Sequence, residues 1–238
     1  MVMVFFKSRA NKMISIIMPL EEDRVDLFEK SIEVYVKQIT KNVPIEFIIP
    51  TRTLKSIYVE GVPTVTVPYE WNEDTFNPAM ALNLGVSHAN YDTVIITSPE
   101  VMPITDVLSQ LVDEIGNNVI CQVFDQEEDG TTGMSLVNSN FRSNHPSMYF
   151  LAMFNKKDIE TINGWDEDFM KAYGYEDDDF GCRFTRAGLT FKVRDDIQAL
   201  HQWHHRPHSQ EGVQKGSQLL YQNSADGVIR PKNGMVKK

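Results

Sequence analysis

The chain has 238 residues, of which 42% are hydrophobic and 24% charged, and its formal net charge is −10. This composition predicts a soluble, cytoplasmic globular protein with a sizeable core, in which Cys121 and Cys182 are buried free thiols rather than a disulfide scaffold. The acidic balance disfavours nucleic acid as a partner, and no apolar run reaches the roughly 18 to 20 residues of a membrane helix.

The first half of the chain alternates apolar segments with amphipathic ones. Five apolar runs predict buried strands, at residues 13–20, 44–50, 63–69, 92–101 and 119–124. Helical spacing predicts three helices, at residues 24–40, 76–90 and 104–116. Asn77 is the expected cap of the second helix, and Pro78 lies in its first turn. This alternation predicts an α/β fold, with a mainly parallel sheet, helices on both faces and ligand-binding loops after residues 19, 50 and 97.

The second half of the chain is less regular. Residues 125–133 predict a polar turn. The elements expected after it are a strand at 147–155, a short helix at 157–164, a helix at 176–187 closed by Gly188, and a strand at 190–196. Beyond residue 205 the sequence becomes polar. We therefore expect a single domain over residues 1–205 and a polar extension over 206–238, packed on that domain or trailing from it.

The segment "AYGYEDDDFGCRF", residues 172–184, places four consecutive carboxylates, Glu176 to Asp179, beside aromatic residues and a glycine. Acidic residues at the start of a helix are favoured by the helix dipole, so a solvated helix start is one interpretation. Crowded carboxylates also raise one another's pKa, and a carboxylate that titrates near neutral pH is a useful general base. Trp165, Tyr173 and Tyr175 would offer flat faces to a sugar ring. We favour the interpretation as an active site.

A second group of polar residues lies at predicted strand ends. Four of the six histidines lie in "HQWHHRPH", residues 201–208, where His201 and His204 follow a predicted strand. Glu100 lies at the end of another, in "ITSPEV", residues 96–101. Histidine is a common ligand of transition metals, and carboxylates favour manganese or magnesium. A ligand role and a surface role are equal alternatives for His201, whereas His205 and His208 are expected on the surface.

Together these segments resemble the nucleotide-sugar glycosyltransferases of the GT-A fold, over residues 13–205. "MISIIMPLEEDR" resembles the first strand of these enzymes, and "FNPAMALNLGVSHANYDTVIITSPEV" resembles the helix and strand that lead to their D-x-D motif. "INGWDEDFMKAYGYEDDDFGCRF" resembles their acceptor and base segment, "GGFDE…GxED…R". Asn163 replaces the first glycine of that pattern, and Gly164 keeps the second.

The resemblance implies a metal site and a donor site. Only Glu100 keeps an acid where the D-x-D motif is expected, and the resemblance places it with His201 and His204 around Mn²⁺ or Mg²⁺. "IIPTRT" stands where many members carry an Asp-rich loop that reads the nucleobase, so the base is left open. The residues expected to bind the donor are Pro19, Leu20, Glu21, Thr51, Arg52, Asn77, Ala81, Asn83, Ser98 and Pro99.

The resemblance also implies roles in the acidic segment. Asp177 matches the carboxylate proposed as general base in inverting members, and Glu176 is its partner in catalysis. The residues expected to bind or shape the acceptor pocket are Trp165, Asp166, Glu167, Tyr175 and Asp178.

The predicted function is transfer of a sugar from a nucleotide-diphosphate sugar to an acceptor hydroxyl, with inversion, on a saccharide or another hydroxyl compound. Two alternative functions remain open. One is a non-catalytic module on the same fold that binds a sugar or nucleotide, and the other is a metal-dependent hydrolase that uses the same acids and histidines. A nucleotidyltransferase is less favoured, because "MPLEEDR" lacks the glycine-rich loop that such enzymes place after the first strand.

Overall fold

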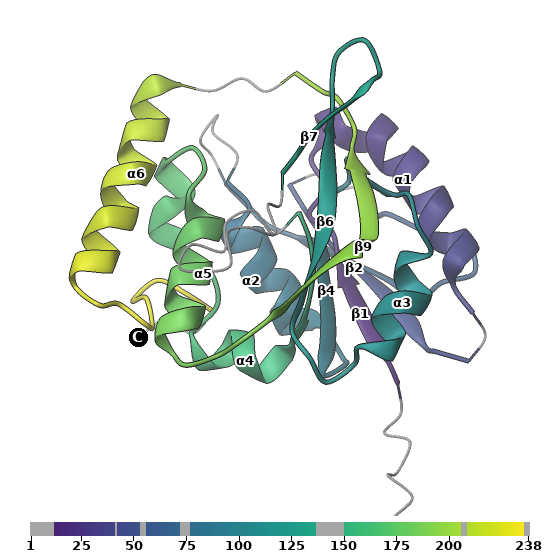
Figure 1. Cartoon of the computed structure of the whole chain (residues 1–238), viewed down its shortest axis with the longest axis horizontal. Helices are drawn as coiled ribbons and strands as arrows, with labels where there is room; N and C mark the ends of the chain where they lie inside the picture. Colours follow the sequence, from purple (N-terminus) through teal and green to yellow (C-terminus); the bar gives the residue numbers. More distant parts are fainter. Residues whose placement is uncertain are drawn as a thin grey trace, which may run out of the picture.

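The structure is a computed structural model that describes residues 12–40, 42–52, 56–71, 77–136, 150–205 and 209–235. Nine described strands form one sheet, and helices cover both of its faces (Figure 1). The predicted α/β class is therefore confirmed.

The predicted elements of the first half are all present, with shifted ends. They are β1 (Ile14–Ile17), α1 (Val25–Gln38), β2 (Ile45–Thr51), β3 (Thr64–Pro68), α2 (Ala79–His88), β4 (Thr93–Thr97), α3 (Val107–Asp113) and β6 (Val119–Gln126). The strand predicted at 92–101 ends at Thr97, and a separate short strand that was not predicted, β5 (Val101–Pro103), follows it. The second half adds β7 (Thr132–Ser135), β8 (Leu151–Asn155), α4 (Lys156–Thr161), α5 (Glu176–Arg186), β9 (Lys192–His201) and α6 (Gln210–Ala225). Two short 3₁₀ helices complete the described elements, η1 (Glu22–Arg24) and η2 (Glu167–Lys171).

The strand order is β3-β2-β1-β4-β8-β6-β9-β5, with β7 paired to β6. The pairs β2–β3, β1–β2 and β1–β4 are parallel, so these four strands run in one direction. β8 is antiparallel to both β4 and β6, and β9 is parallel to β6, so β6 and β9 share that direction. The carboxyl ends of six strands therefore meet at one edge of the sheet, where α/β proteins bind their ligands.

Side chains alternate between two cores, one on each face of the sheet. Ile14 and Ile16 of β1 pack with α1 and α3, whereas Ile17 packs with α2, α4 and α5. The second core is rich in aromatic rings: Phe154 makes edge contacts with Phe180, and Trp165 stacks on Phe180 with ring centroids 4.3 Å apart. These contacts fix α5 against the sheet.

Two predictions for the second half need correction. Residues 125–133 are not one turn, because β6 continues to Gln126 and forms a hairpin with β7. The hairpin carries polar residues because it lies at the end of the sheet, and such strands lack an apolar signal. β9 is longer than predicted, and His201 is its last residue rather than the start of a loop. Residues 147–149 of the predicted strand lie outside the described residues, and β8 starts at Leu151.

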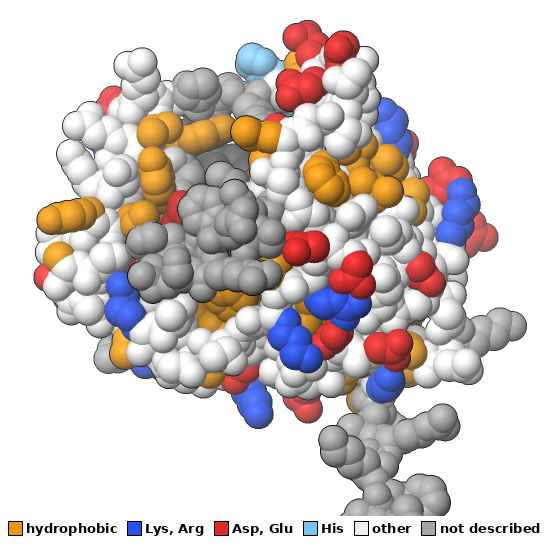
Figure 2. All heavy atoms as spheres, in the orientation of Figure 1, with side chains coloured by type: hydrophobic (Ala, Val, Ile, Leu, Met, Phe, Trp, Pro, Cys, Tyr) orange, Lys and Arg blue, Asp and Glu red, His pale blue; other side chains and the backbone are white. Residues whose placement is uncertain are grey.

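The polar extension contains α6, a helix that the sequence did not predict. Ser209 caps it by accepting a hydrogen bond from the Gly212 backbone N–H at 2.8 Å. α6 packs on α5 and η2 through two glycines and one amide rather than through large apolar side chains, which explains the weak sequence signal. Figure 2 shows that this side of the molecule is mostly uncharged, whereas charged side chains gather on the opposite side.

Cys121 and Cys182 are buried and free, as predicted. The described part of the chain contains no helix that could span a lipid bilayer.

Candidate functional site

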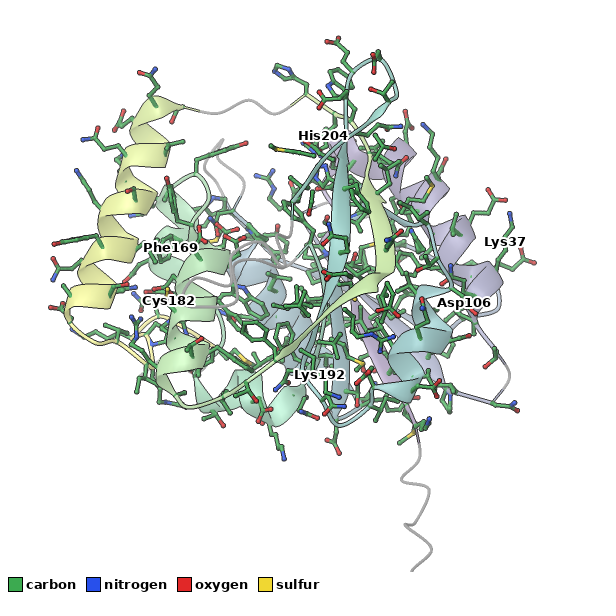
Figure 3. All side chains as sticks on the ribbon, in the orientation of Figure 1. Lys37, Asp106, Phe169, Cys182, Lys192 and His204 are labelled. Carbon is green, nitrogen blue, oxygen red and sulfur yellow. The ribbon has the colours of Figure 1, made fainter. Side chains whose placement is uncertain are left out.

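Glu100, His201 and His204 meet at the carboxyl edge of the sheet. The Nε2 atoms of His201 and His204 lie 3.5 and 3.9 Å from Oε1 of Glu100, and the three ligand atoms all lie within 4.8 Å of one another. Metal–ligand distances of about 2.1 Å place the ligands of one ion roughly 3 to 4 Å apart, so small shifts would suffice. Two imidazoles and a carboxylate are an appropriate donor set for a divalent ion. Figure 3 shows His204 beyond the ends of β6 and β9.

Backbone pairing brings these residues together from distant parts of the sequence. Val101 of β5 pairs with His201 of β9, and the Gln202 N–H donates to the Glu100 carbonyl at 2.9 Å. The Gln202 side chain donates to Ser31 Oγ of α1 at 2.9 Å. The loop that carries Glu100 is thus tied to a strand and a helix, which holds its carboxylate in place.

Asp125 completes this cluster, and the sequence did not predict it. Its Oδ1 lies 3.2 Å from Nδ1 of His201. A carboxylate can only accept, so the ring donates through Nδ1, which fixes the orientation of the imidazole. Asp125 and His201 are register partners on β6 and β9. The signal for Asp125 was an acid near a strand end, the same signal that singled out Glu100.

The electrostatics of the cluster favour ligand-ready forms. Burial would raise the pKa of Glu100, but the hydrogen bond and charge interaction with His201 outweigh it, so the pKa is lowered. Burial lowers the pKa of His204, and the charge of Arg24 adds to this effect. Glu100 therefore stays ionised and His204 stays neutral, the forms that bind a cation.

A second polar cluster lies at the ends of β1, β2 and β3. The predicted donor residues Leu20 and Thr51 form a parallel bridge, and Pro19 and Leu20 are buried beside it. Glu21 is ion-paired with Arg52 and accepts a hydrogen bond from the Tyr69 hydroxyl at 2.9 Å. Burial and the charge of Glu21 raise the pKa of Tyr69, so this hydroxyl remains a donor. Tyr69 is a further candidate that the sequence did not single out.

The acidic segment begins with a strained turn. Tyr175 adopts a left-handed backbone conformation, with φ of 71°, directly after Gly174 with φ of 72°. Such a conformation costs roughly 1 to 3 kcal/mol in a non-glycine residue and is often found at functional sites. It sets the start of α5, and the first turn of that helix then carries the acidic residues Glu176, Asp177, Asp178 and Asp179.

Glu176 connects this segment to the predicted donor side. The Asn77 side-chain amide donates to its Oε2 at 2.9 Å, while the Asn77 Oδ1 accepts from the Ala79 N–H and caps α2. Burial raises the pKa of Glu176, the charge of Asp178 adds to it, and the Asn77 hydrogen bond opposes it. Asn77 follows β3, so the start of α5 lies at the same edge of the sheet as the first cluster.

Asp179 has a buried structural role rather than that of a solvated cap. Its Oδ2 accepts from Arg183 Nε at 2.6 Å, and both side chains are fully buried. Arg183 also donates to the carbonyls of Ile162 and Gly164. The Asn223 amide of α6 donates to Asp179 at 3.0 Å and to Asp166 at 3.0 Å. Removing one partner of such a network typically costs about 3 to 5 kcal/mol, far more than a surface pair.

Several predicted site residues lie below the surface. Trp165 and Asp166 are 1% and 3% exposed, so they support the acidic segment from beneath instead of presenting a face to a ligand. Ala81 is buried in α2, and both polar atoms of Asn83 bond to the backbone of Trp165. Asn83 also donates to Glu167, which ties α2 to η2. Pro99 is buried beside Glu100, and the buried Ser98 hydroxyl has no partner among the described residues. Asp178 lies in the first turn of α5 and is partly exposed.

Two sequence comparisons both match glycosyltransferases. The family model described as the N-terminal domain of galactosyltransferase matches residues 132–208, which include β9, His201, His204 and the acidic segment. An uncharacterized glycosyltransferase of Bacillus subtilis (strain 168), YfnE, is 32% identical over 99 residues. That match covers 42% of this chain and 20% of YfnE, so the chain spans only a fifth of that relative's length.

Solved structures share the fold. S. aureus TarS 1-349 in complex with UDP-GlcNAc has a TM-score of 0.63 at 13% identity, over 87% of this chain and 65% of that one. The mannosyltransferase PcManGT from Pyrobaculum calidifontis, in complex with GDP-Man and Mn²⁺, has a TM-score of 0.55 at 14% identity, over 82% of this chain and 58% of that one. The family model and the curated relative therefore show similarity to glycosyltransferases over part of the chain, and the solved structures share its fold.

Proposed function

We propose that the chain transfers a sugar from a nucleotide-diphosphate sugar to an acceptor hydroxyl, with inversion, using a carboxylate base and a divalent metal. The observation that carries this proposal is the presence of two clusters at the same edge of the sheet. One is Glu100 with His201 and His204, and the other is the acidic first turn of α5.

Glu100, His201 and His204 would hold the metal, and Asp125 would orient His201 from behind. Bound there, a divalent ion would neutralise charge on a diphosphate leaving group. The complexes of TarS with UDP-GlcNAc and of PcManGT with GDP-Man and Mn²⁺ support both the donor class and the metal.

The donor would lie along the carboxyl ends of β1, β2 and β4. Glu21, Arg52 and Tyr69 present both hydrogen-bond donors and acceptors at the ends of β1, β2 and β3. Arg52 is partly exposed, and Glu21 raises its pKa although burial alone would lower it, so its charge is permanent. A fixed cation and a fixed carboxylate would orient the polar groups of a nucleotide.

The base would come from the first turn of α5. Asp177 would accept the proton of the acceptor hydroxyl, and Glu176 and Asp178 would position that hydroxyl. The raised pKa of Glu176, caused mainly by burial, supports an environment that makes a carboxylate in this turn a stronger base. The strained backbone at Tyr175 supports a functional role for this turn.

Calorimetric titration with UDP-GlcNAc and GDP-Man, each with Mn²⁺ and with EDTA, tests the donor half of the proposal. We expect one of them to bind with Mn²⁺ and to lose affinity with EDTA. Glu100→Gln should weaken the same binding, whereas Glu33→Gln, which changes an exposed glutamate on α1, should not. If folded protein binds neither donor under any condition, the proposal is wrong for both donors, and a wider panel of nucleotide sugars then decides the donor class.

A further inference from the structure

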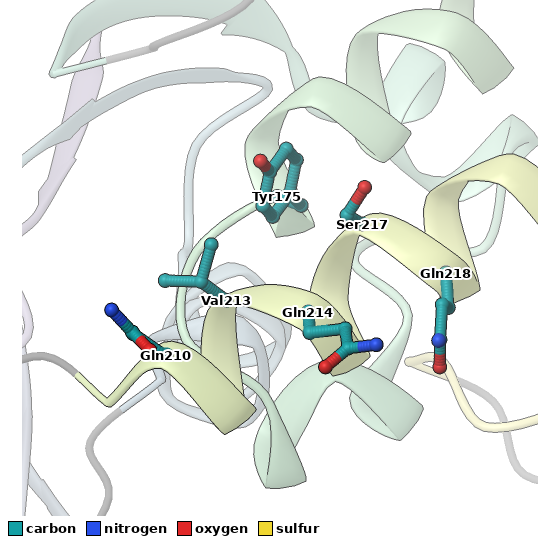
Figure 4. Close-up of a pocket in the computed structure, with 6 residues that line it drawn as sticks. All are labelled: Tyr175, Gln210, Val213, Gln214, Ser217 and Gln218. Carbon is teal, nitrogen blue, oxygen red and sulfur yellow. The ribbon is translucent and has the colours of Figure 1, made fainter.

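A hollow of about 420 Å³ lies between the start of α5 and the side of α6. Figure 4 shows Val213 and Ser217 pointing toward the Tyr175 ring, with three glutamines along the neighbouring side of α6. Its lining residues are Tyr175, Gln210, Val213, Gln214, Ser217 and Gln218.

The polar lining residues form one face of α6. Gln210, Gln214, Ser217 and Gln218 are spaced by three and four residues, and the next position of that face is Tyr221, which is 77% exposed. None of these four polar side chains makes a hydrogen bond within the described part of the chain. We call these five residues the neutral face of α6. The charged residues Glu211 and Lys215 form a separate i, i+4 ion pair at 2.8 Å.

The chemistry of the neutral face is that of a carbohydrate site. Side-chain amides and a hydroxyl both donate and accept hydrogen bonds, as sugar hydroxyls do. Two tyrosines add an apolar ring with a polar tip: Tyr175 lies opposite the middle of the row, beside Gly216, and Tyr221 ends the row. No cation belongs to the face, so it offers no charged partner to a phosphate, sulfate or carboxylate group on a ligand.

The hollow is joined to the acidic turn by close backbone packing. The Tyr173 N–H donates to the Gly212 carbonyl at 3.1 Å. A Cβ on Gly216 would lie 2.9 Å from the Gly174 carbonyl oxygen and 2.9 Å from the Tyr175 ring, so only glycine fits there. Tyr175 is therefore shared between the hollow and the turn that carries Glu176 and Asp177.

We infer that the neutral face of α6 binds an uncharged oligosaccharide that serves as the acceptor, with the sugar next to Tyr175 presented to the acidic first turn of α5. This inference rests on the proposed glycosyl transfer and adds the class of acceptor. Neither the family match, which ends at residue 208, nor the resemblance over residues 13–205 includes α6.

A glycan array that carries neutral and anionic oligosaccharides, probed with the fluorescently labelled full chain, tests the inference. We expect retention on neutral glycans. The double variant Gln214→Ala/Gln218→Ala should weaken that retention about tenfold, the effect of losing one or two neutral hydrogen bonds. Alanine is a better helix former than glutamine, so this variant should keep α6 folded, which thermal unfolding verifies.

The matched control is Glu211→Ala/Lys215→Ala, which alters the charged residues of the same helix and should leave retention unchanged. Three results would overturn the inference: no retention by folded protein, retention on anionic glycans only, or equal retention by the Gln214/Gln218 variant and wild type. Titration of the same preparations with nucleotide sugars separates the two failures. Donor binding without glycan retention rejects the acceptor site alone, whereas absence of all donor binding rejects the proposed function.

Discussion

Two partly buried glutamates at the same edge of the sheet, Glu100 and Glu176, have opposite electrostatic environments. Glu100 faces His201 and has a lowered pKa, although burial alone would raise it. Glu176 lies in the first turn of α5 with Asp178. Burial and the charge of Asp178 raise the pKa of Glu176, and the hydrogen bond from Asn77 only partly opposes this. The ionised form of one carboxylate is favoured by a neighbouring imidazole, whereas the ionised form of the other is disfavoured by burial and a neighbouring carboxylate.

This difference matches the two roles that the proposed transfer reaction requires. A carboxylate that binds a cation works best as a permanent anion. A carboxylate that acts as a general base works better in surroundings that raise its pKa. The sheet supplies the first environment through backbone pairing at Glu100, and the packing of α5 beside Asn77 supplies the second. The comparison therefore supports the proposal that the strand ends bind the metal and that the start of α5 supplies the base.

The largest effect is expected for a substitution in the first turn of α5. Asp177→Asn should lower the rate of sugar transfer by roughly 10²- to 10⁴-fold, because it removes the proposed base, and should leave donor affinity nearly unchanged. Single-turnover transfer and donor titration measure the two quantities. Glu176→Gln is the companion variant: if it abolishes transfer while Asp177→Asn retains it, the base is Glu176 instead.

A smaller effect is expected on the strand side from a residue outside the proposed ligand set. Asp125→Asn weakens the hydrogen bond that orients His201, and loss of such a partner typically lowers metal affinity about 10- to 100-fold. Calorimetric titration with Mn²⁺ measures it. Asp129→Asn is the control, because Asp129 lies in the exposed β6–β7 turn and bonds only to Thr131. Equal Mn²⁺ affinity for wild type and Asp125→Asn would remove Asp125 from the site.

The smallest expected effect concerns the pH dependence of stability, which differs between Glu100 and Glu176. The lowered pKa of Glu100 contributes stability that is present above its ordinary value of 4.5 and is lost as the pH falls through the folded-state pKa. The raised pKa of Glu176 acts in the opposite sense: its ionisation costs stability that grows as the pH rises from 4.5 through its folded-state pKa.

Thermal unfolding of Glu100→Gln and Glu176→Gln, measured in EDTA from about pH 3 to 7, shows how each glutamate changes stability with pH. As the pH rises, Glu100→Gln should lose stability relative to wild type, and Glu176→Gln should gain it. Parallel pH profiles for the two variants would contradict the opposite environments of these carboxylates.

The sequence predicted the parts of this molecule that repeat a simple pattern. Apolar strands such as β1 and β2 and the helices between them were visible because burial on both faces leaves a continuous apolar run. The resemblance led to Glu100, His201 and His204, and the structure brings them together.

Other features depend on contacts that no local pattern encodes. Asp125 reaches His201 only through the β6–β9 register, and that register shifts between Cys121 and Gln122. Trp165 and Asp166 matched a functional motif, yet their side chains pack beneath it. α6 was missed because its contacts with the rest of the chain use glycines and Asn223, which a hydrophobic pattern does not register.

The bond from Asn223 to Asp166 and Asp179 has a consequence for synthesis of the chain. Asn223 lies 44 residues after Asp179 and 57 after Asp166, so both carboxylates leave the ribosome well before their shared partner. At about 5 to 20 residues per second, that interval lasts on the order of seconds. The acidic first turn of α5 should therefore reach its final form only after α6 has emerged. The growing chain would already contain Glu100, His201 and His204 before that turn is complete.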